Sequence, residues 1–383
     1  MAIKVVLTRN LRRNILQGHP WVYRMAVDLP KGERRAQFCK IIDQKGAPLG
    51  CGFFDPHSPL AVRVLHPEKS NFTENDMLER FTQALNLRKP LLGSGTDSYR
   101  LFNGEGDYLP GLVCDLYNRV AVLQFDGQGP SEFWPRELVC TWLKEKVGCE
   151  QVFEKTRGEE CLQLVGPASE GIVECSENSV RFMVNIKKGQ KTGFFLDQRD
   201  NRQYVRTISS AKNCLNLFSY TGGFSVSAGL GGATPVASVD IAAGAIEQAD
   251  ANWRLNGLPD GTHQSIATDV FDFLQVEKAS WDLIIVDPPS MAHSEEQRGK
   301  AREKYSEIFA LAAKRVSEYG SLCLSSCSSH ISFEDFFTII ETALSQARRR
   351  GQIQRVSGQG MDHPFPHACP ELRYLKFAHL VLY

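Results

Sequence analysis

The chain has 383 residues, of which 42% are hydrophobic and 23% are charged, and its formal net charge is zero. This composition is ordinary for a folded chain of two or three domains. Residues 1–100 carry 16 Lys and Arg against 9 Asp and Glu, so the N-terminal part is basic and the remainder is acidic. A basic part indicates contact with a polyanion, although a solvated surface without a partner explains the charge equally well.

The 11 cysteines argue against a disulfide scaffold, because they are odd in number and scattered along a long chain. The first residues, MAIKVVLTRNLRRN, lack the apolar stretch of a secretory signal. No uncharged apolar run is long enough to span a bilayer. We therefore expect a cytoplasmic protein with free thiols.

Residues 1–75 predict a small β-barrel-like module. The apolar runs IKVVL, QFCKIID, LGCGFFD and LAVRVL alternate with turns that contain Gly and Pro. The segment GHPWVY at residues 18–23 resembles the opening of PUA RNA-binding modules, which carry a similar His-Pro-Trp-Val signature. The resemblance implies RNA contacts by the surrounding arginines, which are Arg9, Arg12, Arg13 and Arg24.

Residues 76–186 predict a central α+β unit without a catalytic group of residues, and so a connector or a substrate platform. Turn signals divide residues 97–125 into three strands, and a strand follows at Gln151–Glu154. The spacing of apolar residues predicts helices over Phe72–Asn86 and Glu132–Val147, and a hairpin over Gly171–Ile186 that turns at Glu177-Asn178.

Residues 187–383 alternate strands with helices, which predicts a doubly wound parallel sheet and makes the whole chain multidomain α/β. The expected strands are 213–218, 236–240, 264–268, 282–287 and 321–326, with a late pair near 352–357 and 373–382. The expected helices are about 196–208, 224–230, 242–256, 300–317 and 332–349.

A glycine turn follows the first of these strands and predicts a nucleotide-type cofactor. Glycines in the turn over residues 219–224 let the backbone approach a ligand, and the next helix N-terminus favours negative charge. Asp240 ends the second strand, 18 residues after Gly222, where an acid can bind ribose hydroxyls. A nicotinamide dinucleotide would suit the same layout, but the GxGxxG fingerprint is absent.

Four segments together carry a specific resemblance: KTGFFLDQRD at 191–200, FSYTGGF at 218–224, DPP at 287–289 and SCS at 326–328. The chain resembles class I S-adenosylmethionine methyltransferases and, more narrowly, the PUA-containing 23S ribosomal RNA 5-methylcytosine methyltransferases. The likeness covers essentially the whole chain. The general class I pattern would place an acid at Asn216 and a glycine at Tyr220, so the match is to the narrower family.

The resemblance implies S-adenosylmethionine as cofactor and assigns residues to each part of it. Asp269 would hold the adenine amino group, although capping of the helix that begins at Val270 explains the same acid. The turn at residues 218–222 would wrap the methionine portion, and Asp240 with Ile241 would hold the ribose. The segment at residues 197–199 would fold over the cofactor. These residues are Phe218, Ser219, Tyr220, Thr221 and Gly222; Asp240 with Ile241; Asp269 with Val270; Asp197, Gln198 and Arg199; and Asp287 with Pro288.

Cys327 stands where the family has its nucleophile, which adds to carbon 6 of cytosine so that carbon 5 can attack the methyl group. The alternative is that Cys327, like Cys323 on the same strand, is a small buried hydrophobe. Asp287 would protonate or hydrogen-bond cytosine N3. Ser290 replaces the aromatic residue of amine methyltransferases, and also the second cysteine of other 5-methylcytosine enzymes. The group that assists release therefore stays open.

Two other functions fit parts of this sequence. A related ribosomal family methylates guanine but lacks a cysteine at the position of Cys327, and a non-catalytic RNA-binding assembly factor would not need Asp287 and Cys327. His363, His367 and Cys369 lie close together, but their spacing fits no standard zinc finger, so we expect no metal. The sequence leaves open the target cytosine, naked RNA or a ribosomal particle as substrate, and whether the protein forms a homodimer.

Overall fold

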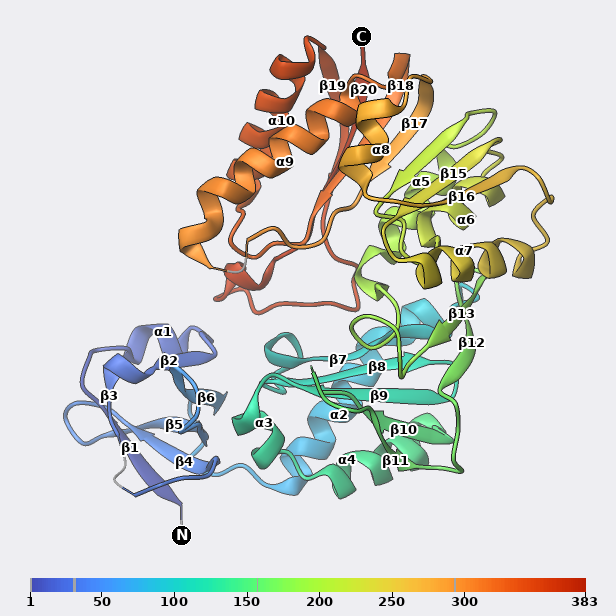
Figure 1. Ribbon diagram of the computed structural model, residues 1–383. Coiled ribbons are helices and arrows are strands. Elements are labelled where there is room, and N and C mark those ends of the chain that lie inside the picture. The colour runs from blue at the N-terminus through green and yellow to red at the C-terminus, as the bar shows by residue number, and fades with distance from the viewer. Residues whose placement is uncertain (1, 30–31, 157, 293) are drawn as a thin grey trace. The chain divides into compact units, whose positions relative to one another are not determined.

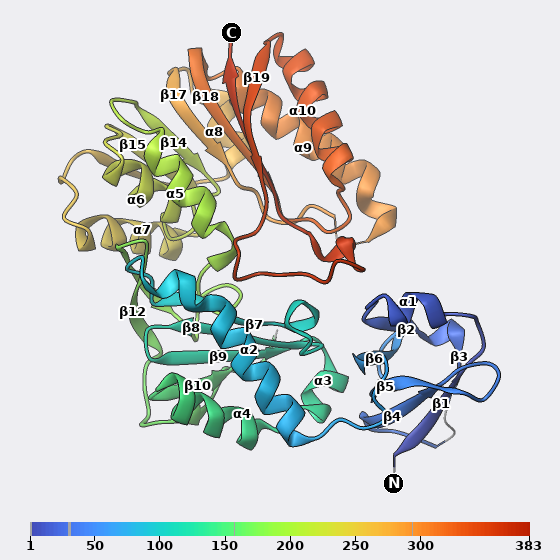
Figure 2. The same cartoon turned by 180° about the vertical axis from the view of Figure 1, so that it is seen from behind.

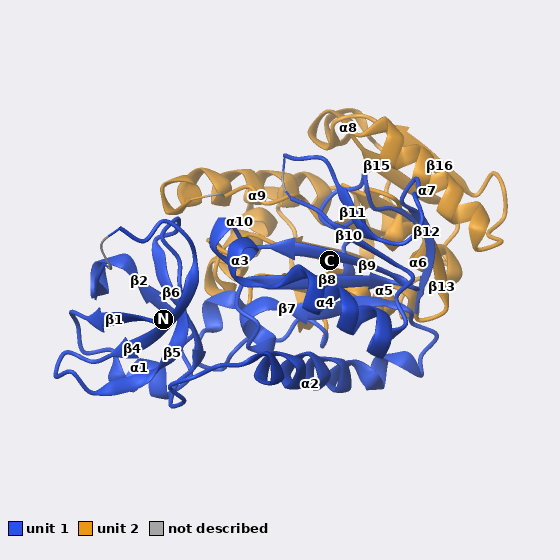
Figure 3. Cartoon of the chain, turned by 90° about the horizontal axis from the view of Figure 1, so that it is seen from below, with its two compact units in different colours: residues 1–177, 184–196, 361–372 blue, residues 178–183, 197–360, 373–383 orange. Residues whose placement is uncertain are grey.

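The computed structural model describes residues 2–29, 32–156, 158–292 and 294–383. Its contacts divide the chain into two compact units (Figure 3). Unit 1 comprises residues 1–177, 184–196 and 361–372, and unit 2 comprises 178–183, 197–360 and 373–383. The two parts predicted at 1–75 and 76–186 thus fall mostly within one unit, and their separation as domains stays a prediction.

Within the described residues, which include all 11 cysteines, the structure contains no disulfide. None of the described helices is both long enough and apolar enough to cross a membrane.

The N-terminal part of unit 1 is a six-stranded, barrel-like sheet with the strand order β2-β6-β5-β4-β1-β3 (Figure 1). Only β1 and β4 pair in parallel, and the other neighbours are antiparallel. The four predicted strands are confirmed, whereas β2, β3 and α1 are too short for a periodic pattern. The elements are β1 (Ile3–Leu7), α1 (Arg12–Leu16), β2 (Trp21–Tyr23), β3 (Val27–Asp28), β4 (Gln37–Ile42), β5 (Pro48–Phe54) and β6 (Leu60–His66).

A second sheet of unit 1 has the order β11-β10-β9-β8-β7, and helices α2 and α4 lie along it (Figure 1). The side chains of Thr73 and Asp76 form a capping box at the start of α2. The strands predicted in this region are confirmed, and so is the hairpin of β12 and β13, of which residues 178–183 belong to unit 2. The elements are α2 (Glu74–Leu92), β7 (Ser98–Asn103), β8 (Leu112–Tyr117), β9 (Val120–Phe125), α3 (Gln128–Phe133), α4 (Arg136–Trp142), β10 (Gln151–Glu154), β11 (Leu162–Val165), β12 (Ile172–Glu177) and β13 (Val180–Asn185).

The helix predicted over Glu132–Val147 is confirmed from Arg136 onwards, but its start is wrong. The chain forms α3, then α4, and then a π-helical segment at Leu143–Val147. Trp134 is extended (φ −77°, ψ 122°) because a residue before proline avoids the helical conformation, and Pro135 follows it.

Buried polar contacts hold residues 361–372 within unit 1. Arg88 makes two hydrogen bonds to Asp107, of 2.5 and 2.7 Å, and a third to the backbone oxygen of Asp362 at 2.8 Å. The carboxylate of Asp362 accepts a hydrogen bond from the backbone N–H of Arg100 at 2.9 Å. This late segment therefore belongs to the unit built mainly by the first half of the chain.

Unit 2 is a doubly wound sheet of seven strands in the order β16-β15-β14-β17-β18-β20-β19. Helices α8, α9 and α10 cover one face, and α5, α6 and α7 cover the other (Figures 1 and 2). All seven predicted strands and five predicted helices are confirmed. The elements are α5 (Arg199–Thr207), β14 (Cys214–Leu217), α6 (Gly223–Leu230), β15 (Val236–Asp240), α7 (Ala243–Leu255), β16 (His263–Ala267), α8 (Val270–Val276), β17 (Trp281–Val286), α9 (Arg298–Ala313), β18 (Val316–Ser326), α10 (Phe333–Ala347), β19 (Gly351–Ser357) and β20 (Lys376–Leu382).

Strand register brings the predicted motifs of unit 2 to one edge of the sheet. Leu217 of β14 pairs with Val239 of β15 and with Val286 of β17. Val286 in turn pairs with Leu324 of β18. The loops after these parallel strands therefore begin side by side. The strand order reverses between β14 and β17, which is where open α/β sheets bind ligands.

Candidate active site

The turn after β14 has an unusual backbone. Phe218 (φ 57°), Tyr220 (φ 47°) and Gly222 (φ 79°) all adopt the left-handed conformation. Residues other than glycine rarely do so, and such strain is concentrated at ligand-binding turns. A Cβ atom at Gly222 would lie 2.8 Å from the Cβ of Ala249, so close packing against α7 also requires glycine here.

The backbone orients the carboxylate of Asp240 at the end of β15. Its Oδ2 accepts a hydrogen bond from the N–H of Tyr220 at 2.8 Å, and its Oδ1 accepts one from the N–H of Ala242 at 2.9 Å. Each carboxylate oxygen can accept a second hydrogen bond, so Asp240 retains the capacity to bind two hydroxyls. The next residue, Ile241, is 72% exposed and presents an apolar surface beside the carboxylate.

Two buried hydroxyl groups in the same turn point to a polar ligand. Within the described part of the chain, Ser219 Oγ and Thr221 Oγ1 have no hydrogen-bond partner. Buried polar atoms in folded proteins are nearly always satisfied, so ordered water or a bound polar group is the expected partner of each hydroxyl. Together with Asp240 and Ile241, these hydroxyls fit a nucleoside that carries a charged, hydrogen-bonding tail.

Asp269 is the N-cap of α8. Its Oδ1 accepts hydrogen bonds from the N–H groups of Phe271 (2.8 Å) and Asp272 (3.2 Å). Capping, the alternative raised by the sequence, is therefore confirmed. The side chain of Val270 is buried in the hydrophobic core. An adenine contact by either residue stays a prediction.

The segment before α5 points inward. Asp197 Oδ2 accepts a hydrogen bond from the hydroxyl of Tyr374 at 2.6 Å, and the buried Arg199 makes a 3.2 Å contact with Asp200. Gln198 Nε2 donates to Asp287 Oδ1 at 2.9 Å and lies 3.3 Å from Ser325 Oγ. Cofactor contacts by these residues stay predictions, but Gln198 is joined directly to the predicted catalytic acid.

Asp287 and Cys327 follow the neighbouring strands β17 and β18. The sulfur of Cys327 lies 4.0 Å from the backbone oxygen of Pro288. Cys327 is half-buried, whereas Cys323 is fully buried in the core and its burial raises the pKa of its thiol. The structure thus separates the two cysteines, because Cys323 is fully buried in a hydrophobic cluster and Cys327 is half-buried beside the Asp-Pro-Pro segment.

Hydrogen bonds tie the two loops around Cys327 together. The hydroxyls of Ser290 and Ser328 both donate to the backbone oxygen of Ala292, at 3.0 and 3.1 Å. The hydroxyl of Tyr305 lies 3.4 Å from Pro289 O, and burial raises the pKa of this phenol. The thiol is therefore held beside the Asp-Pro-Pro segment by a rigid frame.

Known proteins resemble this chain over nearly its whole length. A family model for the S-adenosylmethionine-dependent methyltransferases matches residues 150–343, and a PUA-like domain model matches residues 5–67. The ribosomal RNA large subunit methyltransferase I of Aeromonas salmonicida is 35% identical over 391 residues, which cover 98% of each chain. A ribosomal RNA large subunit methyltransferase of Deinococcus radiodurans is 33% identical over 396 residues, covering 98% of this chain and 96% of that one. This chain belongs to the ribosomal RNA large subunit methyltransferase family.

Solved structures share the fold of this methyltransferase over its whole length. A putative S-adenosylmethionine-dependent methyltransferase from Streptococcus mutans has a TM-score of 0.87 and 23% identity, covering 99% of this chain and all of that one. A putative methyltransferase in complex with SAH (S-adenosylhomocysteine) has a TM-score of 0.88 and 24% identity, with the same coverage. The predicted multidomain α/β fold, the PUA-like module and the cofactor S-adenosylmethionine are thereby confirmed.

The predicted RNA-binding arginines of the methyltransferase differ in their surroundings. Arg9, Arg12 and Arg13 are exposed, and Arg12 makes a 3.6 Å ion pair with Asp43. Arg24 instead donates to the backbone oxygens of Pro56 (2.7 Å) and Ser58 (3.1 Å), so it holds a loop of the barrel. RNA contact stays a prediction for all four, and the structure gives Arg24 a structural role as well.

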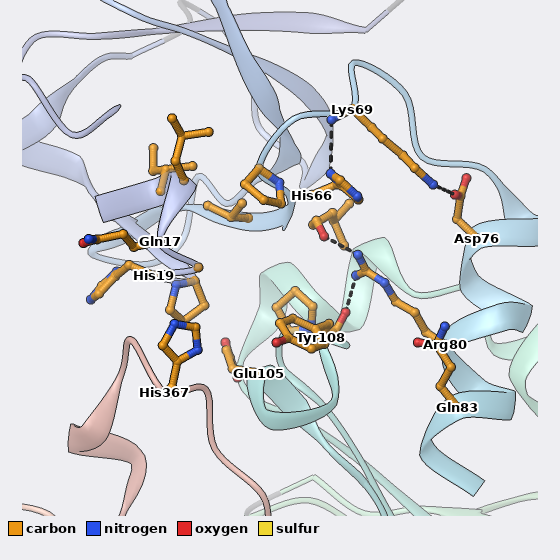
Figure 4. A pocket seen from close by; sticks show the side chains of 18 of the residues that line it. Gln17, His19, His66, Lys69, Asp76, Arg80, Gln83, Glu105, Tyr108 and His367 are labelled. Carbon is orange, nitrogen blue, oxygen red and sulfur yellow. Dashed lines mark hydrogen bonds and ion pairs between the residues drawn. The ribbon is translucent and has the colours of Figure 1, made fainter. Parts of the chain in front are cut away.

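Unit 1 contains a pocket of about 430 Å³ beside the His-Pro-Trp segment (Figure 4). Its two long cationic side chains already have partners: Lys69 pairs with Asp76 at 2.9 Å, and Arg80 donates to the backbone oxygens of Leu65 and Tyr108. Glu105 adds a further acid to the lining. This mixed charge does not favour a phosphate group.

Cys369 belongs to a group of possible metal ligands that differs from the group of His363, His367 and Cys369 considered in the sequence. Its sulfur and the side-chain ligand atoms of His19 and Glu371 lie within 4.8 Å of one another. His19 and Glu371 form a 3.6 Å ion pair, and burial, with Glu371 nearby, raises the pKa of the Cys369 thiol. A thiol held in its protonated form is a poor metal ligand. The absence of a metal stays a prediction.

Sequence reasoning missed Lys376, Tyr374 and Tyr305 as residues of the active-site region. Lys376 left a weak signal, because it opens KFAHLVL, a mostly apolar strand whose other polar residue is His379, and the structure shows that it is only 1% exposed. A buried lysine is unusual and requires hydrogen-bond partners. The two tyrosines left no signal of this kind.

Proposed function

We propose that this methyltransferase transfers a methyl group from S-adenosylmethionine to carbon 5 of a cytosine in 23S ribosomal RNA. The observation that carries the proposal is the half-buried Cys327, held beside Asp287 and Pro288 at the ligand-binding edge of the sheet. The names of the related proteins and the PUA-like module support ribosomal RNA as substrate.

Cys327 supplies the nucleophile that carbon 5 lacks. Its thiolate forms a bond to carbon 6, and the displaced electron pair makes carbon 5 an enamine-type nucleophile. S-adenosylmethionine, when bound, supplies the methyl group that carbon 5 attacks. A general base, for which the sequence leaves the residue open, then takes the proton from carbon 5, the ring double bond re-forms, and the carbon–sulfur bond breaks to return the thiolate.

Asp287 stabilises the adduct at N3 of the base. Since the amide of Gln198 donates to Oδ1, a proton on this carboxyl group resides on Oδ2. A protonated Oδ2 donates to N3 as electron density moves onto the ring. Carbon 5 is inaccessible in a stacked helix, so the target cytosine is single-stranded or flipped out of its helix.

The covalent bond is tested with RNA that carries 5-fluorocytosine at the target position. This base has no proton at carbon 5, so the enzyme should stall as a protein–RNA adduct that survives denaturation and requires S-adenosylmethionine. Cys327→Ala should abolish the adduct and turnover while cofactor binding persists. Cys323→Ala is the matched control and should retain the adduct, with some loss of stability from the core.

An adduct that persists in Cys327→Ala would refute this mechanism. Methylated guanine in the product RNA would identify a guanine methyltransferase instead. RNA binding without any methylated product would indicate a non-catalytic assembly factor.

A further inference from the structure

A buried ammonium group lies behind the predicted nucleophile. Lys376 opens β20 and donates to the backbone oxygens of Ser328 (2.6 Å), Ile331 (2.7 Å) and Tyr374 (2.7 Å). An ammonium group has three N–H donors, so these carbonyls satisfy all of them. Ser328 directly follows Cys327, so Lys376 holds the backbone turn that comes immediately after the thiol-bearing residue.

The charge of Lys376 also acts on the thiol. Opposite charges attract strongly in a weakly polar interior, and a nearby cation favours the thiolate over the thiol. Burial lowers the pKa of Lys376 to about 8, whereas Cys327 and Asp335 act in the opposite direction. The two groups are therefore electrostatically coupled.

We propose that Lys376 is a positioning residue for Cys327, which holds the turn at Ser328–Ile331 and stabilises the thiolate through its buried positive charge. This role deepens the proposed function, on which its catalytic consequence rests. All three ammonium protons are bound by carbonyls, so the lysine acts on the sulfur through its charge and not as a proton donor.

Other titratable groups around the thiol come from three elements. Asp287 follows β17 and, when ionised, opposes formation of the thiolate. Burial raises the pKa of Tyr305 on α9, which keeps that phenol neutral. Asp335 on α10 is paired with Arg298 at 2.8 Å, so much of its charge is compensated. Lys376 is the buried cation of this group.

The test is alkylation of Cys327 by iodoacetamide in the full-length protein, followed across pH by peptide mass spectrometry. Lys376→Met keeps a side chain of similar length but removes the charge. In this variant, the midpoint of the pH profile of Cys327 alkylation should move to higher pH. The rate at pH 7 should fall about tenfold for each unit of that shift. Lys212→Met is the matched control. Lys212 donates to the hydroxyl of Ser321 at 3.0 Å, on the strand β18 that leads to Cys327, and its replacement should leave the alkylation profile of Cys327 unchanged.

Alkylation needs neither RNA nor methyl transfer, so its outcome is independent of whether Cys327 forms an adduct with cytosine. A folded Lys376→Met protein with the wild-type alkylation profile would overturn the proposal and leave Lys376 a purely structural residue.

If Lys376→Met does not fold, the reciprocal measurement decides. The pKa of Lys376 is followed by NMR of isotope-labelled lysine in wild-type and Cys327→Ser proteins. Removing the thiolate should lower this pKa, and an unchanged pKa would contradict the proposal. Burial also lowers the pKa of Lys155. A Lys155→Gln variant identifies the NMR signal of Lys155, so that it is not mistaken for that of Lys376.

Discussion

The side-chain amide of Gln198 donates a hydrogen bond to Oδ1 of Asp287, across 2.9 Å and 89 positions of sequence. The amide is itself held, because Asn201 Nδ2 donates to Gln198 Oε1 at 2.6 Å. Ser357 donates in turn to Asn201 Oδ1 at 2.7 Å. This series of hydrogen bonds orients the amide so that its NH₂ group faces Oδ1 of the carboxyl group.

Replacing Gln198 by Leu should slow catalysis. A hydrogen bond between neutral groups is worth about 0.5–1.5 kcal/mol, and its loss frees the carboxyl group to turn away from the base, so kcat should fall roughly 2- to 10-fold. Single-turnover kinetics and cofactor titration separate this effect from cofactor binding. If the sequence-based assignment of Gln198 to the cofactor is the main role, the Kd for S-adenosylmethionine rises and kcat at saturation is retained. Gln203→Leu, at an exposed position of α5, is the control.

Asp240→Ala should weaken the binding of S-adenosylmethionine by roughly one to two orders of magnitude. The variant loses two charge-assisted hydrogen bonds to ribose, and it also releases the N–H groups of Tyr220 and Ala242. Isothermal titration calorimetry measures the change. Asp272→Ala, an exposed acid on α8, should bind normally. Unchanged affinity in a folded Asp240→Ala protein would remove this residue from the site.

The basic N-terminal module should contribute phosphate contacts. In a protein with Arg12→Ala and Arg13→Ala, the affinity for ribosomal RNA fragments should decrease. The slope of log K against log salt should fall by about one to two, because fewer counterions are released. Filter binding at several salt concentrations gives the slope. Arg34→Ala with Arg35→Ala removes the same charge from another exposed site of the module. Equal losses of RNA affinity in the two double variants would argue against a specific RNA contact by Arg12 and Arg13.

His379 should make the methyltransferase less stable in acid. Burial, together with Lys212, lowers the pKa of His379 to about 4, against about 6.5 when unfolded. The unfolded chain therefore binds more protons between these values. The stabilisation is complete above pH 6.5 and is lost progressively as the pH falls towards 4. Urea unfolding across this range should show a weaker pH dependence in His379→Gln than in the wild type. The half-buried His330→Gln is the control.

Local patterns in the sequence determined the elements of unit 2 and the residues at their ends. Strand and helix types follow from short-range apolar periodicity, and parallel strands necessarily bring their carboxyl ends to one edge. The loops that begin at Phe218 and Asp287, and the motif at Cys327, could therefore be placed together from the sequence alone. The wrong start of the helix predicted over Glu132–Val147 also had a local cause, since Pro135 interrupts that region.

Only the tertiary structure decided what each of these side chains touches. Lys376 and Ser328 are 48 residues apart and meet because β20 pairs antiparallel with β18, in a register that sequence periodicity does not specify. The cofactor contact expected for Gln198 stays a prediction, and the structure adds a hydrogen bond from its amide to Asp287 that no sequence pattern indicated. Side-chain direction depends on strand register and helix packing, which arise from contacts distributed over the whole unit. Motifs therefore identified the residues of the site, while the fold determined how they are connected.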